Sequence, residues 1–385
     1  MKATILALGL YRSSGGPSKS VAAFQRALSA DVVSWVDPMA YAREPLIWDG
    51  VKCRHYIVTG SSRPVLRQLC YPQRRGLAEA ERIVAGSDLV SSHSFWRWHN
   101  VWLERVAALH RVPYWFVPHG ALDPYVMETE MLVKRAFLSL GGRRFLKGAR
   151  AVVCATQREY DKLAQLMPQA RPVILPWPLD DADFRVQDAA QRAIVRNRLR
   201  IPADALVLLS FGRLHPMKRP LETIVAFAAG APPSAHLLVV GNECGVTAAD
   251  CRTMAEKHGV AERVHLTGPA YGAVKAGYLD AADVYVSLSH RENFNFTAAE
   301  ALATGLPVML SPGNDLGPDL EPADCGWLLA SPDAAAEAMA SLGGLSPEHI
   351  SAKGERGRAW AEANLRYDVF ATRLQEAAAR LVASG

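Results

Sequence analysis

The chain has 385 residues, a formal net charge of +5, and a composition that is 50% apolar and 21% charged. These values exclude a disordered, fibrous or disulfide-stapled protein and predict two globular domains of ordinary size. No apolar run reaches the roughly 18 residues that a membrane-spanning helix needs. The short apolar stretch after Met1 and Lys2 is not followed by a small-residue cleavage site. We interpret it as a first buried strand and expect a cytoplasmic protein.

Positive charge is concentrated in the first half of the chain. Residues 1–178 contain 24 Lys and Arg against 13 Asp and Glu, whereas the remainder contains 19 against 25. Two groups carry much of the excess: Arg63, Arg67, Arg74, Arg75 and Arg82, and then Lys134, Arg135, Arg143, Arg144, Lys147 and Arg150. They are either solvated helix faces or a surface for an anionic membrane or a phosphorylated acceptor. No nucleic-acid-binding motif accompanies them, so we expect no nucleic-acid partner.

Short apolar runs alternate with segments of helical periodicity along the whole chain. The strands expected in the first half are 3–8, 32–35, 89–91, 114–117, 151–154 and 173–175; those in the second half are 206–211, 236–240, 263–266, 284–288, 307–310 and 326–329. Fully apolar strands that alternate with helices predict parallel sheets covered on both faces. Two such series predict two doubly wound α/β domains, 1–178 and 179–365. The two prolines at 176 and 178 form the connector, and a last amphipathic helix follows in 366–385.

Polar residues that suit ligand binding follow several strands of the first half. Gly15 and Gly16 lie between the first strand and the first helix, where backbone N–H groups suit a pyrophosphate or a sugar. The glycine positions do not match an ATPase phosphate loop, and a plain structural turn is an equal alternative. His93 and Trp96 follow a later strand, as do His119, Gly120 and Asp123. Each of these histidines is either structural or a ligand for a sugar hydroxyl.

The sequence Phe-Gly-Arg-Leu-His-Pro-Met-Lys-Arg-Pro at 211–220 follows the first strand of the second half. Gly212 allows a tight turn, and Arg213 and Lys218 can converge on a diphosphate leaving group. Two solvated loop cations would give the same pattern.

The most specific pattern runs from 289 to 308. Glu292 lies in a loop at the carboxyl end of a strand, where ligands bind in such sheets. Glu300 lies eight residues further on, inside a helix that begins near Phe296. The N–H groups at the start of that helix suit phosphate oxygens. Read by spacing alone, an ordinary loop acid and an ordinary helix acid remain possible.

Taken together and in this order, these segments resemble glycosyltransferase family 4. The resemblance covers about residues 1–330 and is strongest over 205–315; the strings at 118–124 and 290–295 resemble a bacterial polysaccharide and lipopolysaccharide subgroup. It implies the GT-B fold, in which two Rossmann-like domains face a central cleft, and retaining transfer of a hexose from a UDP- or GDP-sugar. The implied acceptor is a glycan or a lipid-linked glycan, and the implied location is the cytoplasm or the inner face of the cell membrane.

The resemblance also implies roles for individual residues. Glu292, Arg213, Lys218 and His119 form the catalytic set; Gly15, Gly16, Gly212, Gly241, Leu266, Asn293, Phe294, Asn295, Phe296 and Glu300 contact the sugar donor; His93, Trp96 and Asp123 lie on the acceptor side. Asn295 departs from the glycine that many members have there, which puts the identity of the sugar in doubt.

The same resemblance implies that no metal and no other cofactor is needed. The six cysteines and eleven histidines show no metal-ligand spacing, so we expect free thiols and no metal site. The alternatives are a sugar-nucleotide epimerase or an inverting transferase of the same fold, and a non-catalytic protein that binds a sugar nucleotide.

Overall fold

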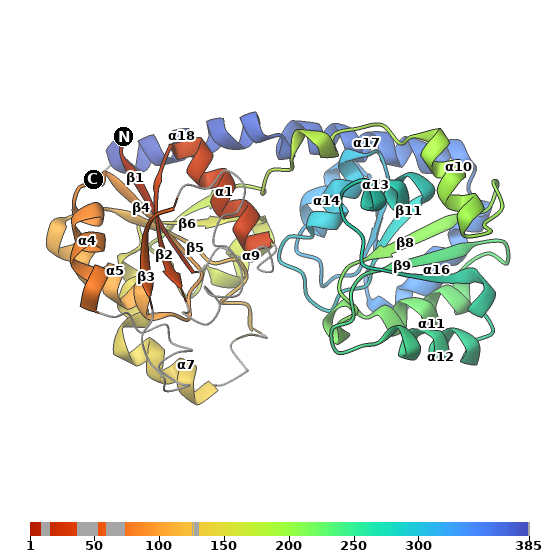
Figure 1. The fold of residues 1–385 in the computed structure, drawn as a ribbon, viewed down its shortest axis with the longest axis horizontal. Helices are drawn as coiled ribbons and strands as arrows, with labels where there is room; N and C mark the ends of the chain where they lie inside the picture. Colours follow the sequence, from red (N-terminus) through yellow and green to blue (C-terminus); the bar gives the residue numbers. More distant parts are fainter. Residues whose placement is uncertain (9–15, 37–52, 59–73, 125, 127–130, 384–385) are drawn as a thin grey trace. The chain divides into compact units, whose positions relative to one another are not determined.

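The computed structural model describes residues 1–8, 16–36, 53–58, 74–124, 126 and 131–383. The chain divides into two compact units (Figure 1): Met1–Pro178 with Tyr367–Gly385, and Leu179–Arg366. Each unit contains one parallel sheet with helices on both faces, so the predicted α/β class is confirmed.

The sheet of the first unit has seven parallel strands in the order β3-β2-β1-β4-β5-β6-β7. The strands are β1 (Ala3–Leu8), β2 (Asp31–Val36), β3 (Cys53–Val58), β4 (Leu89–His93), β5 (Tyr114–Val117), β6 (Ala151–Cys154) and β7 (Arg171–Ile174). The helices are α1 (Gly16–Leu28), α4 (Arg74–Ala85), α5 (Trp98–His110), α7 (Met131–Phe137), the π-helical turn η2 (Leu138–Gly142), α8 (Arg143–Gly148), α9 (Gln157–Leu163) and α18 (Tyr367–Ala383).

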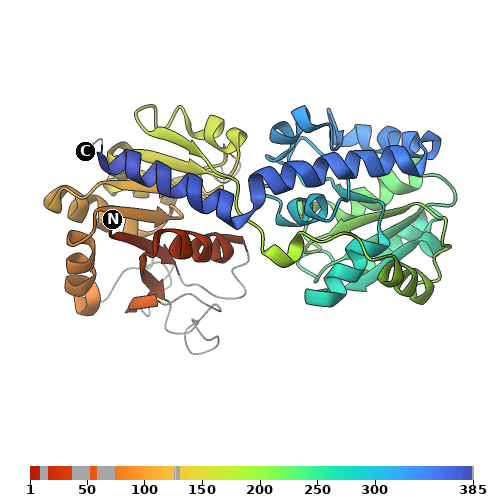
Figure 2. The same ribbon diagram turned by 90° about the horizontal axis from the view of Figure 1, so that it is seen from above.

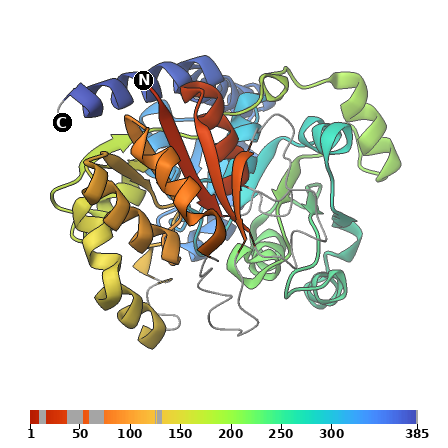
Figure 3. The ribbon, with the colours of Figure 1, turned by 60° about the vertical axis from the view of Figure 1, so that its left-hand side comes forward.

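Successive strand residues face opposite sides of this sheet and enter two cores. Phe116 packs with Phe145 of α8 on one side. On the other side, Trp115 packs against Phe24 of α1, which also contacts Phe370 of α18. The last helix therefore belongs to the first unit, although it is distant in sequence. Figure 2 shows α18 running beside α1, and Figure 3 shows the strands of this sheet side by side.

The sheet of the second unit has six parallel strands in the order β10-β9-β8-β11-β12-β13. The strands are β8 (Val207–Phe211), β9 (His236–Val240), β10 (Val264–Gly268), β11 (Val284–Ser287), β12 (Val308–Leu310) and β13 (Gly326–Leu328). The main helices are α10 (Ala189–Arg198), α11 (Pro220–Gly230), α12 (Ala248–Lys257), α13 (Gly272–Ala281), α14 (Phe296–Ala303), α15 (Gly317–Leu320), α16 (Ala335–Ser341) and α17 (Pro347–Leu365). Short 3-10 turns complete it: η3 (Asp181–Asp183), η4 (Pro216–Lys218), η5 (Ala261–Arg263), η6 (Glu321–Ala323), η7 (Pro332–Ala334) and η8 (Leu342–Gly344).

The strand order of this sheet reverses between β8 and β11, and ligands bind such sheets just beyond the carboxyl ends of the strands at a reversal. The segments after β8 and β11 are η4 and the loop 288–295. Helices α11, α12 and α16 cover one face of the sheet through residues such as Phe227 and Met339. The fold thus brings the Arg213–Lys218 segment next to the Glu292 segment.

Two features differ from the sequence-based expectation. The sequence did not predict β3, an edge strand whose run includes Arg54 and His55, because polar residues at a sheet edge interrupt the apolar signal. Lys134 does not belong to a solvated basic face: the residue is 7% exposed, and its Nζ donates a hydrogen bond to the Val126 carbonyl.

Two further findings concern the residues that the structure describes. No described helix is both long and apolar enough to span a membrane. The cysteines whose side chains are described are all free: Cys154, Cys244, Cys251 and Cys325.

Candidate active site

Charged side chains gather after β8 and β11 of the second unit. Lys218, at the end of η4, forms an ion pair with the carboxylate of Glu292, and both side chains are partly buried. Arg213 lies in the exposed segment between β8 and η4, with its guanidinium 3.8 Å from the Cys244 sulfur. The pair keeps opposite charges at the edge of the sheet, where an anionic ligand can compete with Glu292 for the lysine ammonium.

Gly241 allows β8 and β9 to end close together, whereas a Cβ on Gly212 would meet only the Lys218 side chain, at 3.8 Å. The Gly212 N–H donates to the Val240 carbonyl at 2.9 Å, and a Cβ on Gly241 would collide with the Gly212 carbonyl oxygen. Gly241 is therefore required by packing, whatever it contacts in a ligand. Leu266 is half-buried on the edge strand β10, beside Val239.

The loop that carries Glu292 is held by a buried polar network. Asn295 is only 3% exposed; its Nδ2 donates to Ser287 Oγ and Asn314 Oδ1, and its Oδ1 accepts the Ala298 N–H at 3.1 Å as the N-cap of α14. The Asn314 amide in turn donates to the Ser287 carbonyl at 3.0 Å. Asn295 thus points into the protein, so its departure from glycine acts on the loop and not through a side chain aimed outward.

The start of α14 offers backbone donors, but fewer than the sequence suggested. The Phe296 N–H already donates to the Phe294 carbonyl at 3.1 Å, and the Ala298 N–H is capped by Asn295. Within the described residues, no acceptor faces the N–H groups of Asn293 and Thr297. Phe294 and Phe296 pack edge to face at 5.0 Å and shape the same segment.

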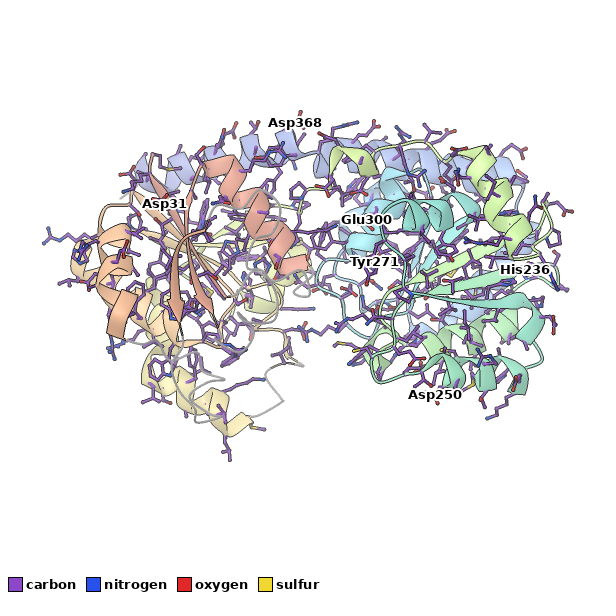
Figure 4. All side chains as sticks on the ribbon, viewed as in Figure 1. Asp31, His236, Asp250, Tyr271, Glu300 and Asp368 are labelled. Atoms are coloured by element: carbon purple, nitrogen blue, oxygen red, sulfur yellow. The ribbon has the colours of Figure 1, made fainter. Side chains whose placement is uncertain are left out.

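Glu300 is 3% exposed and pairs with Lys275 of α13 at 2.8 Å. A lysine beside a buried carboxylate offsets part of the cost of burying its charge and holds the side chain in place. Figure 4 shows Glu300 on the side of the unit where Tyr271 begins α13, whereas His236 lies at the opposite end of the sheet. Sequence reasoning missed Lys275, because a single lysine on a helix has no motif.

In the first unit, a tight turn follows β5. His119 and Gly120 both have positive φ values, 50° and 69°. The buried Glu159 carboxylate accepts the Gly120 N–H at 2.8 Å and the Ala155 N–H at 2.8 Å. This carboxylate, which sequence reasoning also missed, fixes the turn that projects His119.

His119 is joined to His93, which ends β4. His93 Nδ1 lies 2.9 Å from His119 Nε2, and His93 Nε2 lies 2.9 Å from Ser91 Oγ. Desolvation lowers the pKa of His119 to about 4, and desolvation together with the neighbouring His119 holds the pKa of His93 well below its usual range. Both rings are therefore neutral near pH 7.

The other acceptor-side candidates already have partners within the protein. Trp96 Nε1 donates to the Ala121 carbonyl at 2.7 Å, and the Asp123 carboxylate pairs with Lys162 at 2.7 Å. They support the turn that carries His119. Gly16 begins α1, and Gly15 lies outside the described residues.

For metal ligands, a search of the described part of the chain finds no group of three or more His, Cys, Asp or Glu side chains placed to hold an ion.

Two parallel α/β units with polar clusters at the carboxyl ends of their strands are typical of enzymes that bind nucleotides. A family model described as glycosyl transferases group 1 matches residues 191–355, and one described as a glycosyl transferase 4-like domain matches residues 15–178. The chain belongs to the family 4 glycosyltransferases with the GT-B fold.

Solved structures support the same fold. Anabaena HepE in complex with UDP aligns with a TM-score of 0.78 and 18% identity, over 99% of this chain and 100% of that one. The sucrose-phosphate synthase of Thermosynechococcus elongatus aligns with a TM-score of 0.73 and 20% identity over all of both chains. At these identities the likeness concerns the fold alone.

Curated relatives are similar over part of their length. The D-inositol 3-phosphate glycosyltransferase of Kineococcus radiotolerans is 30% identical over 289 residues, 68% of this chain and 63% of the relative. That of Xylanimonas cellulosilytica is 29% identical over 250 residues, 60% of this chain and 57% of the relative. The match therefore spans a little more than half of these relatives.

Proposed function

We propose that the protein transfers a hexose, with retention of the anomeric configuration and without a metal, from a UDP- or GDP-sugar to a glycan or lipid-linked glycan. The observation that carries this proposal is the Lys218–Glu292 pair beside Arg213 at the reversal of strand order in the second sheet. Cations and backbone N–H groups there suit a diphosphate, and the carboxylate suits sugar hydroxyls.

The proposed chemistry follows from these charges. When the bond from the sugar to the diphosphate breaks, negative charge develops on the leaving oxygen. Arg213 and Lys218 stabilise that charge, which is the role that Mn²⁺ or Mg²⁺ has in other enzymes. The acceptor hydroxyl attacks the anomeric carbon from the leaving-group face and gives its proton to the departing phosphate oxygen, so neither a protein nucleophile nor a protein base is required. Glu300, held by Lys275, binds the ribose hydroxyls.

The diphosphate site is tested by thermal shift with UDP, GDP, ADP and their hexose conjugates. A nucleotide at 100 times its Kd should stabilise the protein by about 2.7 kcal/mol. Arg213→Ala should abolish the shift, whereas Arg252→Ala, an exposed arginine of α12, should retain it. A shift that survives Arg213→Ala would contradict the assignment.

The reaction is tested by incubating the stabilising sugar nucleotide with acceptors and determining the anomer of the product by NMR. Retention, unchanged by EDTA, is expected. An inverted product, an epimerised sugar nucleotide, or binding without turnover would each replace this proposal with one of the alternatives of the same fold.

The acceptor is proposed to belong to bacterial surface polysaccharide synthesis. The positive first half of the chain suits an anionic acceptor. Because the curated relatives are named for inositol 3-phosphate, the acceptor panel includes that compound beside lipid-linked glycans. Transfer to inositol 3-phosphate alone would overturn the polysaccharide assignment.

We also propose that the first unit docks on an anionic membrane through α7 and η2. Four apolar side chains are exposed there: Met131 at 46%, Leu132 at 81%, Val133 at 50% and Leu140 at 59%. Arg135, Arg143 and Lys147 belong to the same stretch of chain, a combination typical of interfacial segments.

Vesicle sedimentation tests this docking. Binding should require anionic lipid and fall with Leu132→Glu, whereas Leu109→Glu, an equally simple change at an exposed leucine of α5, should leave it unchanged. Equal binding to neutral vesicles would remove the proposal.

A further inference from the structure

We propose that Ser91, His93 and His119 form a hydrogen-bond chain of one polarity, which holds a proton on His119 Nδ1 and presents it to an oxygen acceptor on the substrate. Ser91 and His93 are then positioning residues. The inference deepens the proposed function, on which the identity of that acceptor as a sugar oxygen rests.

The strand geometry makes the chain possible. Ser91 and His93 are two residues apart on β4, so their side chains face the same side of the sheet. Ser92, between them, faces the other side and donates to Asn100 Oδ1 at 2.6 Å. The contacts Ser91 Oγ to His93 Nε2 and His93 Nδ1 to His119 Nε2 are both 2.9 Å, within normal hydrogen-bond range.

Counting protons selects the polarity. Each neutral imidazole has one N–H, so the chain runs either from Ser91 towards His119 or in the opposite direction. In the first direction the Ser91 hydroxyl donates to His93, and His93 donates to His119. In the opposite direction the Ser91 hydroxyl hydrogen needs another acceptor, and among the described residues Ser91 has no partner other than His93.

Burial of Ser91 and His93 determines the free-energy difference between the two directions of the chain. Ser91 is 1% exposed and His93 is 2% exposed, so water does not replace the missing acceptor. An unpaired buried hydroxyl should favour the first direction by about 5- to 150-fold, the ratio that corresponds to about 1–3 kcal/mol. The neutral state of both rings, set by their lowered pKa values, keeps the count at one N–H each.

The outer end of the chain is His119 Nδ1. This atom has no partner among the described residues, and His119 as a residue is half-buried. The ring is held in place because Glu159 anchors the following N–H and Trp177 packs against it with ring centroids 5.4 Å apart. A fixed N–H donor recognises a hydroxyl or carbonyl oxygen. In this tautomer His119 cannot serve as a general base at Nδ1, which agrees with a reaction that needs no base.

The tautomer is measured directly by ¹⁵N NMR of the full protein labelled in histidine, with signals assigned by single His→Gln variants. His119 and His93 should each carry the proton on Nδ1 at pH 7. Protonation of either ring on Nε2 in the unmodified protein would overturn the proposal, whether or not the protein transfers sugar.

Variants test the positioning role. Ser91→Ala should populate both tautomers of His119 and lower kcat/KM by several-fold, and Ser91→Thr should restore both. Ser92→Ala, which removes an equally buried hydroxyl from the same strand, should change neither. An equal effect of Ser92→Ala, or an unchanged tautomer in Ser91→Ala, would show that Ser91 is merely structural. If sugar transfer is absent altogether, the NMR result still stands, and only the acceptor oxygen loses its identification.

Discussion

In the second unit the candidate site consists of partly exposed charges, whereas in the first unit it consists of neutral rings at the end of a buried hydrogen-bond chain. The difference follows from what each group is proposed to bind. A diphosphate demands cations, which can remain solvated until the ligand arrives. A sugar hydroxyl demands one donor in one orientation, and burial is what fixes it.

The largest effect should come from the charged site. Lys218→Ala should lower kcat/KM by about 100- to 1,000-fold, the range for loss of one preorganised group that stabilises developing charge. Lys257→Ala, at the exposed end of α12, is the matched control and should be neutral. A loss below tenfold for Lys218→Ala would mean that the Lys218–Glu292 pair is structural. The two units would then not differ in the kind of catalytic group that they supply.

The neutral rings of the first unit should make its stability depend on pH. Desolvation and the nearby Arg97 lower the pKa of His99 to about 3, so below about pH 6.5 the unfolded chain takes up a proton that the folded chain does not. His99 should therefore make stability fall as the pH falls, by about 1.4 kcal/mol per pH unit or about 2 kcal/mol between pH 6.5 and pH 5. The lowered pKa values of His93 and His119 should act in the same direction. Above pH 6.5 His99 is neutral in both the folded and the unfolded chain, so it no longer makes stability depend on pH.

Urea unfolding followed by tryptophan fluorescence measures this slope, since seven of the nine tryptophans lie in residues 1–178. His99→Leu should reduce the slope by about 1.4 kcal/mol per pH unit and leave the part that His93 and His119 contribute. The substitution breaks no hydrogen bond of normal geometry, because neither ring nitrogen of His99 makes one. Leu109→Gln, at an exposed residue of the same helix, changes no titratable group and should leave the slope unchanged. An unchanged slope in His99→Leu would contradict the lowered pKa.

A smaller effect should separate Asn295 from an ordinary helix cap. Asn295→Ala removes the N-cap of α14 and two buried hydrogen bonds, those to Ser287 and Asn314, so it should destabilise the protein by about 2 kcal/mol. Thr247→Ala removes only the exposed cap of α12 and should cost about 1 kcal/mol. If thermal unfolding shows equal losses of stability for the two variants, the hydrogen bonds from Asn295 to Ser287 and Asn314 add nothing to the helix cap.

The smallest effect should come from the outer end of the histidine chain. His119→Asn keeps a residue that tolerates positive φ and removes one neutral hydrogen bond to the substrate, so kcat/KM should fall by about five- to tenfold. A loss as large as that of Lys218→Ala would assign His119 a charge-handling role and erase the difference between the two units.

Much of the second unit's site was predictable because its residues lie in two short strings. The resemblance implied that Lys218 and Glu292 both serve the sugar donor, but their direct ion pair was not predicted and depends on β8 and β11 being neighbours in the sheet. Lys275 was not predictable, because its contact with Glu300 depends on how α13 packs beside α14. Asn295 was identified as unusual, but its inward orientation depends on Ser287 and Asn314, which are distant in the chain.

The site of the first unit was harder to predict from the sequence. The polar run Ser91-Ser92-His93 at the end of an apolar strand was a signal, yet only the packed sheet shows that Ser91 and His93 share a face with His119. Glu159 gave no signal at all, because its partners are backbone N–H groups of other segments.

By itself the sequence determined the α/β class, the parallel sheets, and the charged residues that follow the strands of the second half. Apolar periodicity and charge are local properties, and a chain displays them before it folds. Only the tertiary structure decided which polar groups are buried, which partner each has, and hence where protons lie. Those properties depend on desolvation and on contacts between residues far apart in the chain, and no local pattern encodes them.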